Sequence, residues 1–194
     1  MNLKDLNPPL TELPAGQTFF RVQLLRARPG SVKLNGLLLP PAGVLSGRFC
    51  LPDQVTAYLA DSADTALFES QFRRDAVSRS LAELRKRALL QITSTQPLRL
   101  VDLRPLAEPY PLLQSLRIAQ TQALAVDCFK AGHHGLVYAS AQHPQHACVA
   151  LFPDGIAALR RTQSWSLVKP GTRQLLHTVV DAARRSGVPL LNDD

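Results

Sequence analysis

The sequence of 194 residues lacks the features of a membrane or exported protein. No apolar run reaches the roughly 18 residues that cross a bilayer. Residues 1–20 carry charges and prolines where a secretory signal would have an apolar segment. The three cysteines, Cys50, Cys128 and Cys148, are too few and too widely spaced for a disulfide framework. We therefore expect a cytoplasmic protein that makes no contact with a membrane.

Several common motifs of nucleotide and hydrolase sites are also missing. There is no GxGxxG, no GxxxxGK[ST], no GxSxG and no HExxH. A nucleotide site in this chain would therefore bind phosphates through cationic side chains. His143, His146 and Cys148 have a spacing that is uncommon for zinc, and no fourth ligand is evident, so we expect no metal site.

The chain is basic, with 22 Lys and Arg residues against 15 Asp and Glu, a formal net charge of +7. Such a charge is one mark of a nucleic-acid-binding protein. However, aromatic residues make up only 6% of the sequence, which is few for base stacking, and the arginines are dispersed over expected helix faces. These two features argue against direct nucleic-acid binding. A basic pocket for a phosphorylated small molecule explains the positive charge equally well.

The length and the 45% hydrophobic content predict one globular domain that needs no metal or disulfide to fold. Short strands mixed irregularly with helices predict an α+β fold around a core sheet. We expect residues 1–18 to form an N-terminal arm and residues 19–194 to form the domain, with a long Gly- and Pro-rich loop over 27–47 that contains one short strand at 37–39. Strands are expected at 19–25, 48–51, 56–60, 98–103, 135–140, 147–152 and 163–168, and helices at 63–74, 80–91, 115–131 and 172–186.

The segment 48–70 contains the residue types of a reactive site. Arg48 and Tyr58 fall on expected strands, and Glu69 falls on the next helix beside the apolar pair Phe68 and Phe72. A carboxylate beside an apolar stripe is partly desolvated unless it has a partner, and Arg48 is a candidate partner. From spacing alone, a structural Arg–Glu pair with a core tyrosine explains this segment as well as a catalytic site does.

Four stretches together carry a resemblance to a known family. They are GRF (47–49), YLADSADTALFES (58–70), LRLVDLRPL (98–106) and GLVYASAQHPQHACVALF (135–152). In this order they resemble the RES domain, named for its Arg, Glu and Ser, over about residues 19–168. The resemblance implies an ADP-ribosyltransferase-like mixed β-sheet core with flanking helices, found in toxins of bacterial toxin–antitoxin modules.

Matched residue by residue, the resemblance implies a site for NAD. The implied catalytic residues are Arg48, Tyr58, Glu69 and Ser140. A second basic residue falls on Arg21, in the FFR strand. The chain departs from the family in having Phe49 after Gly-Arg, where many members have Trp, and in lacking the arginine that follows the serine in many members. The resemblance assigns NAD binding to Arg21, Arg48, Tyr58 and Ser140, with His143 as the candidate replacement for the missing arginine.

The implied activity is cleavage of NAD at the nicotinamide–ribose bond, by hydrolysis or phosphorolysis, by the toxin of a type II toxin–antitoxin system. NAD is then a substrate, and no prosthetic group or metal is needed. The implied partner is an antitoxin with a helix-turn-helix DNA-binding half, and a homodimer is left open. Two alternatives remain: a mono-ADP-ribosyltransferase that modifies one protein target, and a non-catalytic basic module that binds nucleic acid.

Overall fold

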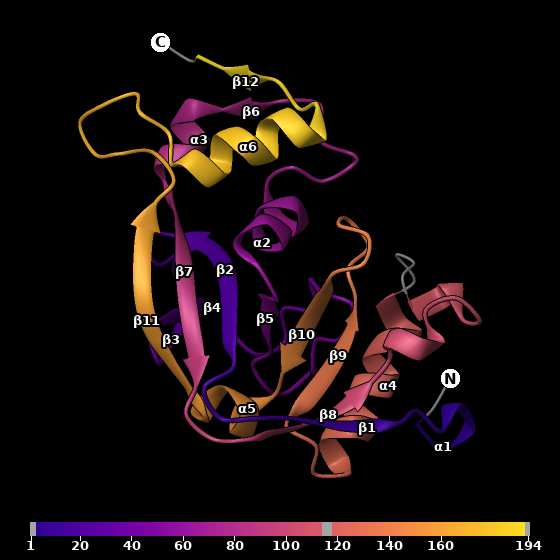
Figure 1. Ribbon diagram of the computed structural model, residues 1–194. Coiled ribbons are helices and arrows are strands. Elements are labelled where there is room, and N and C mark those ends of the chain that lie inside the picture. Colours follow the sequence, from indigo (N-terminus) through magenta and orange to yellow (C-terminus); the bar gives the residue numbers. More distant parts are fainter. Residues whose placement is uncertain (1–2, 114–117, 193–194) are drawn as a thin grey trace.

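The computed structural model describes residues 3–113 and 118–192, which form a curled eight-stranded sheet with helices against it (Figure 1). All neighbouring strands are antiparallel except β8 and β9, which are parallel, so the sheet is mixed. In spatial order, the strands are β1 (Leu10–Leu13), β8 (Leu98–Asp102), β9 (Gly135–Ala139), β10 (Ala147–Leu151), β5 (Ala57–Ala60), β2 (Thr18–Leu24), β7 (Arg87–Ser94) and β11 (Leu159–Ser166).

Helices and two small sheets complete the fold. The small sheets are the antiparallel hairpin β3 (Val32–Leu34)–β4 (Leu37–Leu39) and the parallel pair β6 (Arg79–Ser80)–β12 (Leu190–Leu191). The helices are α1 (Leu3–Leu6), α2 (Ala63–Ser70), α3 (Leu81–Arg85), α4 (Ile118–Lys130), α5 (Pro153–Ala157) and α6 (His177–Ser186), with 3-10 turns η1 (Arg104–Leu106) and η2 (Pro111–Leu113). None of the helices in these described ranges is long and apolar enough to span a membrane.

The sheet separates two apolar cores, because alternate residues of a strand point to opposite faces. One core is built with side chains from α2, α4 and α6, and the other with side chains from β4 and α5. Strand β7 contributes to both: Leu89 belongs to the first core, and Leu90 belongs to the second. The predicted α+β class is thus confirmed.

Two predicted elements are wrong. The helix expected over 80–91 is a short helix, α3, followed by β7; residues 88–90 are buried on both faces of the sheet, and such a run has no period that separates strand from helix. The strand expected at 48–51 is a turn, in which the Cys50 N–H donates to the Gly47 carbonyl at 3.3 Å.

Other boundaries shift by a few residues. The helices expected over 63–74 and 172–186 are shorter, and the strand expected at 163–168 begins earlier, at Leu159. The helix expected over 115–131 is seen from Ile118, and residues 114–117 lie outside the described residues. The expected long loop contains a hairpin, β3–β4, rather than one strand. Within the expected N-terminal arm, β1 pairs with β8 at the edge of the main sheet.

Candidate active site

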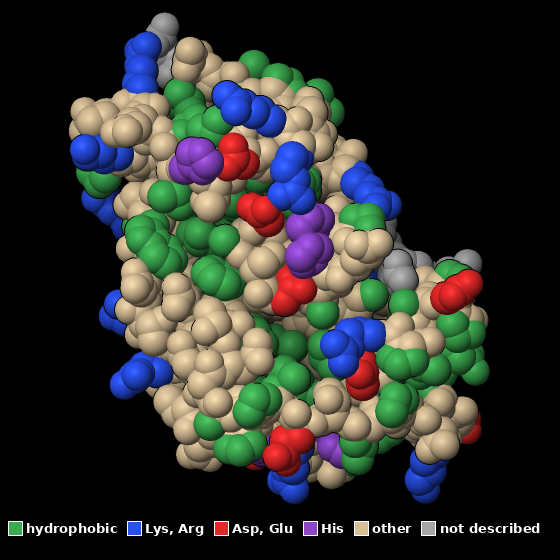
Figure 2. All heavy atoms as spheres, viewed as in Figure 1, with side chains coloured by type: hydrophobic (Ala, Val, Ile, Leu, Met, Phe, Trp, Pro, Cys, Tyr) green, Lys and Arg blue, Asp and Glu red, His purple; other side chains and the backbone are tan. Residues whose placement is uncertain are grey.

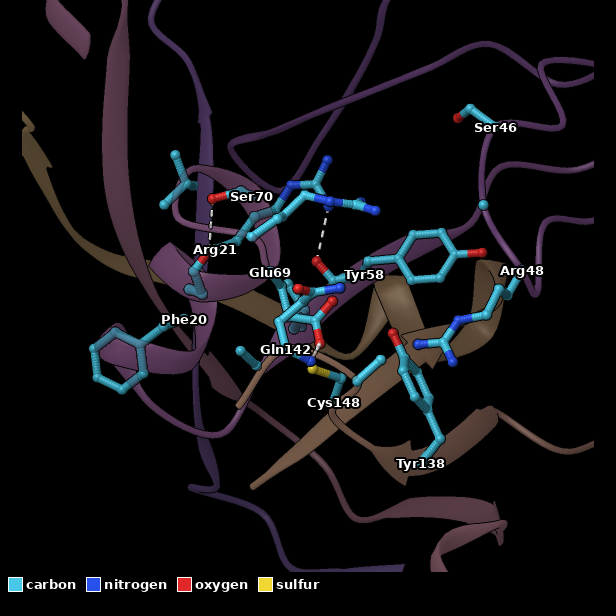
Figure 3. A pocket seen from close by; sticks show the side chains of 17 residues that line it. Phe20, Arg21, Ser46, Arg48, Tyr58, Glu69, Ser70, Tyr138, Gln142 and Cys148 are labelled. Carbon is cyan, nitrogen blue, oxygen red and sulfur yellow. Dashed lines mark hydrogen bonds between the residues drawn. The ribbon is translucent and has the colours of Figure 1, made fainter. Parts of the chain in front are cut away.

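One row of residues across four strands forms the floor of a cleft. Tyr138 of β9 pairs with Cys148 of β10, Cys148 pairs with Ala60 of β5, and Ala60 pairs with Phe20 of β2. All four line a cleft of about 380 Å³, a volume within the range of small-molecule sites. Figure 3 shows that Glu69, Tyr58 and Arg48 reach the same hollow from α2, from β5 and from the loop before β5.

Glu69 lies one residue from the end of α2, and a serine orients its carboxylate. The N-cap of the helix is Ser62, whose hydroxyl accepts from the Thr65 N–H at 3.1 Å. At the other end, the Ser140 hydroxyl donates to Glu69 Oε1 at 2.5 Å, and the Gln142 N–H lies 3.4 Å from the same oxygen. No Lys or Arg in the described part of the chain forms an ion pair with Glu69. The carboxylate is therefore held without being neutralised.

Ser140 has no hydrogen-bonding capacity to spare. Its oxygen accepts from the N–H groups of Gln142 at 3.2 Å and His143 at 2.9 Å, while its only proton is directed at Glu69. The serine thus ties the β9–β10 loop and the end of α2 to each other.

Arg48 does not pair with Glu69, so the structural Arg–Glu pair considered from the sequence is not formed. Its Nη1 donates to the Leu113 carbonyl at 2.8 Å, and its guanidinium lies over the rings of Tyr138, at 4.8 Å, and Phe49, at 5.6 Å. Neither contact involves a carboxylate, and no other described side chain or carbonyl accepts from the remaining N–H donors, which can bind a ligand.

The Tyr58 hydroxyl contacts the loop that carries Arg48. The Tyr58 oxygen accepts from the Phe49 N–H at 2.8 Å and lies 3.5 Å from the Cys50 sulfur. A Cβ at Gly47 would come within 2.4 Å of this oxygen, so only glycine allows the approach. Burial raises the pKa of Tyr58, and the phenol stays neutral at ordinary pH.

Arg21 lies beside the cleft, where its side chain donates to backbone carbonyls between β2 and β5. Strands β2 and β5 pair only at Phe20 and Ala60, and beyond this point the Arg21 guanidinium donates to the carbonyls of Tyr58, at 2.8 Å, and Leu38, at 3.4 Å. Its Nε is buried with no partner. Burial lowers the pKa of Arg21 to about 10, so it is charged at neutral pH. It forms no ion pair with any described acidic residue.

Two predicted site residues, Ser140 and His143, do not line the cleft; Ser140 contacts Glu69 behind it, whereas His143 points away from it. Its ring is buried between α2 and α6, where Nδ1 is 2.8 Å from Thr65 Oγ1 and Nε2 is 2.8 Å from Arg185 Nη2. The residues of this loop that line the cleft are Ala141 and Gln142. A direct contact between His143 and a phosphate has no support in this geometry.

Sequence reasoning missed Tyr138, Cys148, Gln142 and Arg73, which also line the cleft. Tyr138 could have been found, because it lies two residues before Ser140 and a strand repeats its face every second residue. Cys148 was predicted as a buried residue of an apolar strand, and it is 3% exposed. Burial raises the pKa of this thiol, which therefore stays protonated.

The charges define what the cleft can bind. Two arginines, Arg21 and Arg48, have no acidic partner among the described residues and share the cleft with one carboxylate, Glu69, and with two tyrosines. Buried charges without partners are costly, and an anionic ligand would relieve that cost at the arginines. The described residues include no cluster of three or more His, Cys, Asp or Glu side chains arranged to hold a metal ion. The arrangement suits a ligand that is anionic at one end and cationic at the other.

The fold and the sequence place this chain in a family. Residues 19–169 match the model of the RES domain, so the chain belongs to the RES domain family, as the resemblance predicted. A solved structure with a similar fold is described as the crystal structure of the M. tuberculosis MbcT–MbcA toxin–antitoxin complex. The match has a TM-score of 0.57 and 19% sequence identity, and it covers 80% of this chain and 86% of that chain. No curated protein sequence matches the chain.

Proposed function

We propose that this chain is the toxin of a toxin–antitoxin system and that it cleaves NAD at the nicotinamide–ribose bond. One observation carries the proposal: an oriented carboxylate, Glu69, shares a cleft with Arg21 and Arg48, and none of the three has an oppositely charged partner among the described residues. NAD complements such a site, because its pyrophosphate is anionic and its nicotinamide ring is cationic.

In this proposal the arginines hold the pyrophosphate. Arg48 has unused N–H donors on a fork that matches two phosphate oxygens. Arg21 is committed to two carbonyls, so it acts mainly through its charge and its unpartnered Nε. Side-chain cations then do the work that a glycine-rich phosphate loop does elsewhere, which agrees with the absence of such a loop from the sequence.

Glu69 acts on the ribose. Breaking the bond to nicotinamide builds positive charge on the sugar as an oxocarbenium ion, and a carboxylate that is already in place stabilises this charge. Ser140 holds Oε1, and no described residue bonds to Oε2, which can accept from a ribose hydroxyl. Since its proton and lone pairs are used, Ser140 serves as a positioning residue for Glu69.

The rings of Tyr58 and Tyr138 form the wall on which the nicotinamide stacks, because an aromatic face tolerates a cationic ring. Cys148 is excluded as a nucleophile by its protonated state. The acceptor of the ADP-ribosyl group is then water, phosphate or a side chain of a target protein, and the nicotinamide leaves in each case.

The similar solved structure is a complex of a toxin with its antitoxin, which supports an antitoxin as the partner of this chain. We propose a helix-turn-helix antitoxin, action in the cytoplasm, and a homodimer as the state to test for the free toxin.

The test is nicotinamide release from NAD by the purified protein, with and without phosphate, beside the Glu69→Gln variant. We expect release by the wild type and a loss of at least roughly a hundredfold in the variant. Dependence on phosphate would identify phosphate as the acceptor. If the folded wild type releases no nicotinamide, and labelled NAD in a cell lysate marks no protein, the proposed activity is wrong.

A further inference from the structure

A chain of polar contacts behind the cleft connects α6 to the loop that holds Glu69. Arg185, in the last turn of α6, contacts His143 Nε2 through Nη2 and pairs with Asp64 through Nη1. His143 belongs to the β9–β10 loop, and its own N–H donates to the Ser140 hydroxyl. Helix α6 starts after the stretch that matches the RES domain, which ends at residue 169. The contact therefore joins a helix that follows the matched stretch to the loop that holds Glu69.

The contact with Arg185 determines which nitrogen of the His143 ring carries the proton. An arginine N–H can only donate, so Nε2 of His143 accepts and the ring proton lies on Nδ1. Nδ1–H then donates to Thr65 Oγ1 at 2.8 Å, and the Thr65 and Ser62 hydroxyls share a hydrogen bond at 2.7 Å in which either can donate. This series of polar contacts thus runs from α6 to the N-terminal cap of α2, the helix that carries Glu69.

The His143 ring is also enclosed on both faces. It stacks on Phe68 with ring centroids 4.7 Å apart and on His146 with centroids 3.9 Å apart. On the face of the molecule in Figure 2, histidine side chains lie next to acidic and basic side chains. Phe68 directly precedes Glu69, and Arg185 lies over the Phe68 ring at 5.3 Å. With edges and faces all occupied, the ring has one position relative to α2.

We propose that Arg185 and His143 are positioning residues that lock the β9–β10 loop onto α2 and so hold the Ser140–Glu69 contact in its reactive geometry. The proposal rests on the proposed function for the role of Glu69, and it adds that a helix outside the RES domain tunes the site. Neither residue touches the substrate. Their loss displaces the carboxylate by a small distance and leaves the arginines that hold the ligand in place.

The expected signature is a change in kcat rather than in KM. In Arg185→Leu, we expect kcat for nicotinamide release to fall roughly tenfold, with KM within about twofold, because small displacements of a reacting group slow the chemical step. The matched control is Arg184→Leu, which removes the same charge from the adjacent position of α6 and should leave both constants unchanged. Arg185→Lys, which keeps the charge on a single donor nitrogen, should recover part of kcat.

Two measurements test whether Arg185 and His143 hold the β9–β10 loop on α2, and neither depends on enzymatic activity. The imidazole 15N–1H correlation spectrum should show His143 protonated on Nδ1 in the wild type and in Arg184→Leu, and a mixture of tautomers in Arg185→Leu. Hydrogen exchange should show the amides of Gln142 and His143 protected in the wild type and faster in Arg185→Leu. These readouts separate this proposal from the proposed function, since they hold whether or not NAD is cleaved.

Each outcome decides the proposal. A slower kcat together with the altered tautomer and exchange, all confined to Arg185 variants, supports it. Equal behaviour of Arg185→Leu and Arg184→Leu in tautomer and exchange overturns it, even if NAD is cleaved. If the wild type releases no nicotinamide and labels no protein in a lysate, but Arg185→Leu shows the tautomer and exchange changes, the proposed function is refuted and the structural role of Arg185 and His143 is supported. If Arg185→Leu does not fold, Arg185→Lys is compared with Arg184→Leu instead, and the same changes are expected at smaller size.

Discussion

The two ends of the cleft are built differently. At the Glu69 end, a helix terminus and a hairpin loop are tied by hydrogen bonds through one serine, and a buried histidine sits behind them. At the Arg48 end, a loop without regular structure carries the arginine, whose guanidinium makes one hydrogen bond, to Leu113, and rests on aromatic rings. The carboxylate is thus fully positioned, while the arginine keeps most of its donors.

The two ends of the cleft suit two different roles, transition-state stabilisation at the Glu69 end and phosphate binding at the Arg48 end. A group that stabilises charge developing in a transition state is effective when it is fixed before the reaction, since no reorganisation is then needed. A group that captures a phosphate needs unused donors and a charge that no carboxylate has neutralised. The comparison therefore predicts that changes at the Glu69 end lower kcat and that changes at the Arg48 end raise KM.

The largest effect is expected from Ser140→Ala. The substitution removes the 2.5 Å contact to Glu69 and leaves the N–H groups of Gln142 and His143 without their acceptor. We expect kcat for nicotinamide release to fall by roughly a hundredfold with a small change in KM. Ser140→Thr keeps the hydroxyl and should retain far more activity. A rise in KM alone would place Ser140 among the ligand-binding residues instead.

The next effect is expected from Arg48→Ala. Loss of a charge-assisted contact to phosphate should raise KM about ten- to a hundredfold and change kcat little. Steady-state kinetics with NAD measures both constants. Arg99→Ala removes the same charge from an exposed position of β8 and should resemble the wild type. A matching loss in the Arg99 variant would mean that overall charge, rather than Arg48, attracts the ligand.

A smaller effect is expected from Gly47→Ala. The added methyl group would overlap the Tyr58 hydroxyl, so the loop or the ring must move, at a cost of roughly 1–3 kcal/mol in the free energy of unfolding. We expect a lower melting temperature and a KM raised several-fold, because the loop carries Arg48. Thermal melts and kinetics check the two parts. Unchanged stability would show that the Tyr58–Gly47 contact is loose in solution.

The smallest effect concerns pH. Burial, and then the nearby charges of His146 and Arg185, lower the pKa of His143, against the opposing influence of Asp64 and Asp61. The histidine pKa in the unfolded chain is about 6.5. At pH values between the lowered pKa and this value, the unfolded chain binds a proton at His143 and the folded chain does not. Stability from this group is complete above that value and declines as pH falls through the lowered pKa.

Melting temperatures between pH 8 and pH 5 measure this decline. The decrease should be smaller in His143→Gln than in the wild type, because glutamine does not titrate. An equal decrease in both proteins would assign the pH dependence to other groups, such as His133, whose pKa burial also lowers.

The sequence predicted the parts of this molecule that local patterns determine. Alternating or continuous apolar runs located β5, β9 and β10, and the Ser62 cap located α2, so Glu69 was placed on the correct helix. The resemblance to the RES domain brought Arg21, Arg48, Tyr58, Glu69 and Ser140 into one hypothesis, and four of these five line one cleft, with Ser140 bonded to Glu69.

The rest depends on contacts between distant segments. No local sequence pattern indicates that β2 and β5 pair at one residue position alone. The sequence therefore could not predict that the Arg21 guanidinium donates to two backbone carbonyls. His143 was expected to bind NAD as the replacement for the arginine that follows the serine in many family members, yet its ring contacts Arg185, which lies 42 positions along the chain. Strand β7 read as a helix because both faces of a central strand are apolar.

The most direct test of the division between the two ends is the binding of intact NAD to Glu69→Gln, compared with the double variant that also carries Arg48→Ala. The first variant removes turnover, so the dissociation constant can be measured at equilibrium. The account predicts that Glu69→Gln binds NAD with a Kd near the KM of the wild type and that adding Arg48→Ala weakens binding by about tenfold or more. It is contradicted if Glu69→Gln no longer binds NAD, or if Arg48→Ala leaves the Kd unchanged.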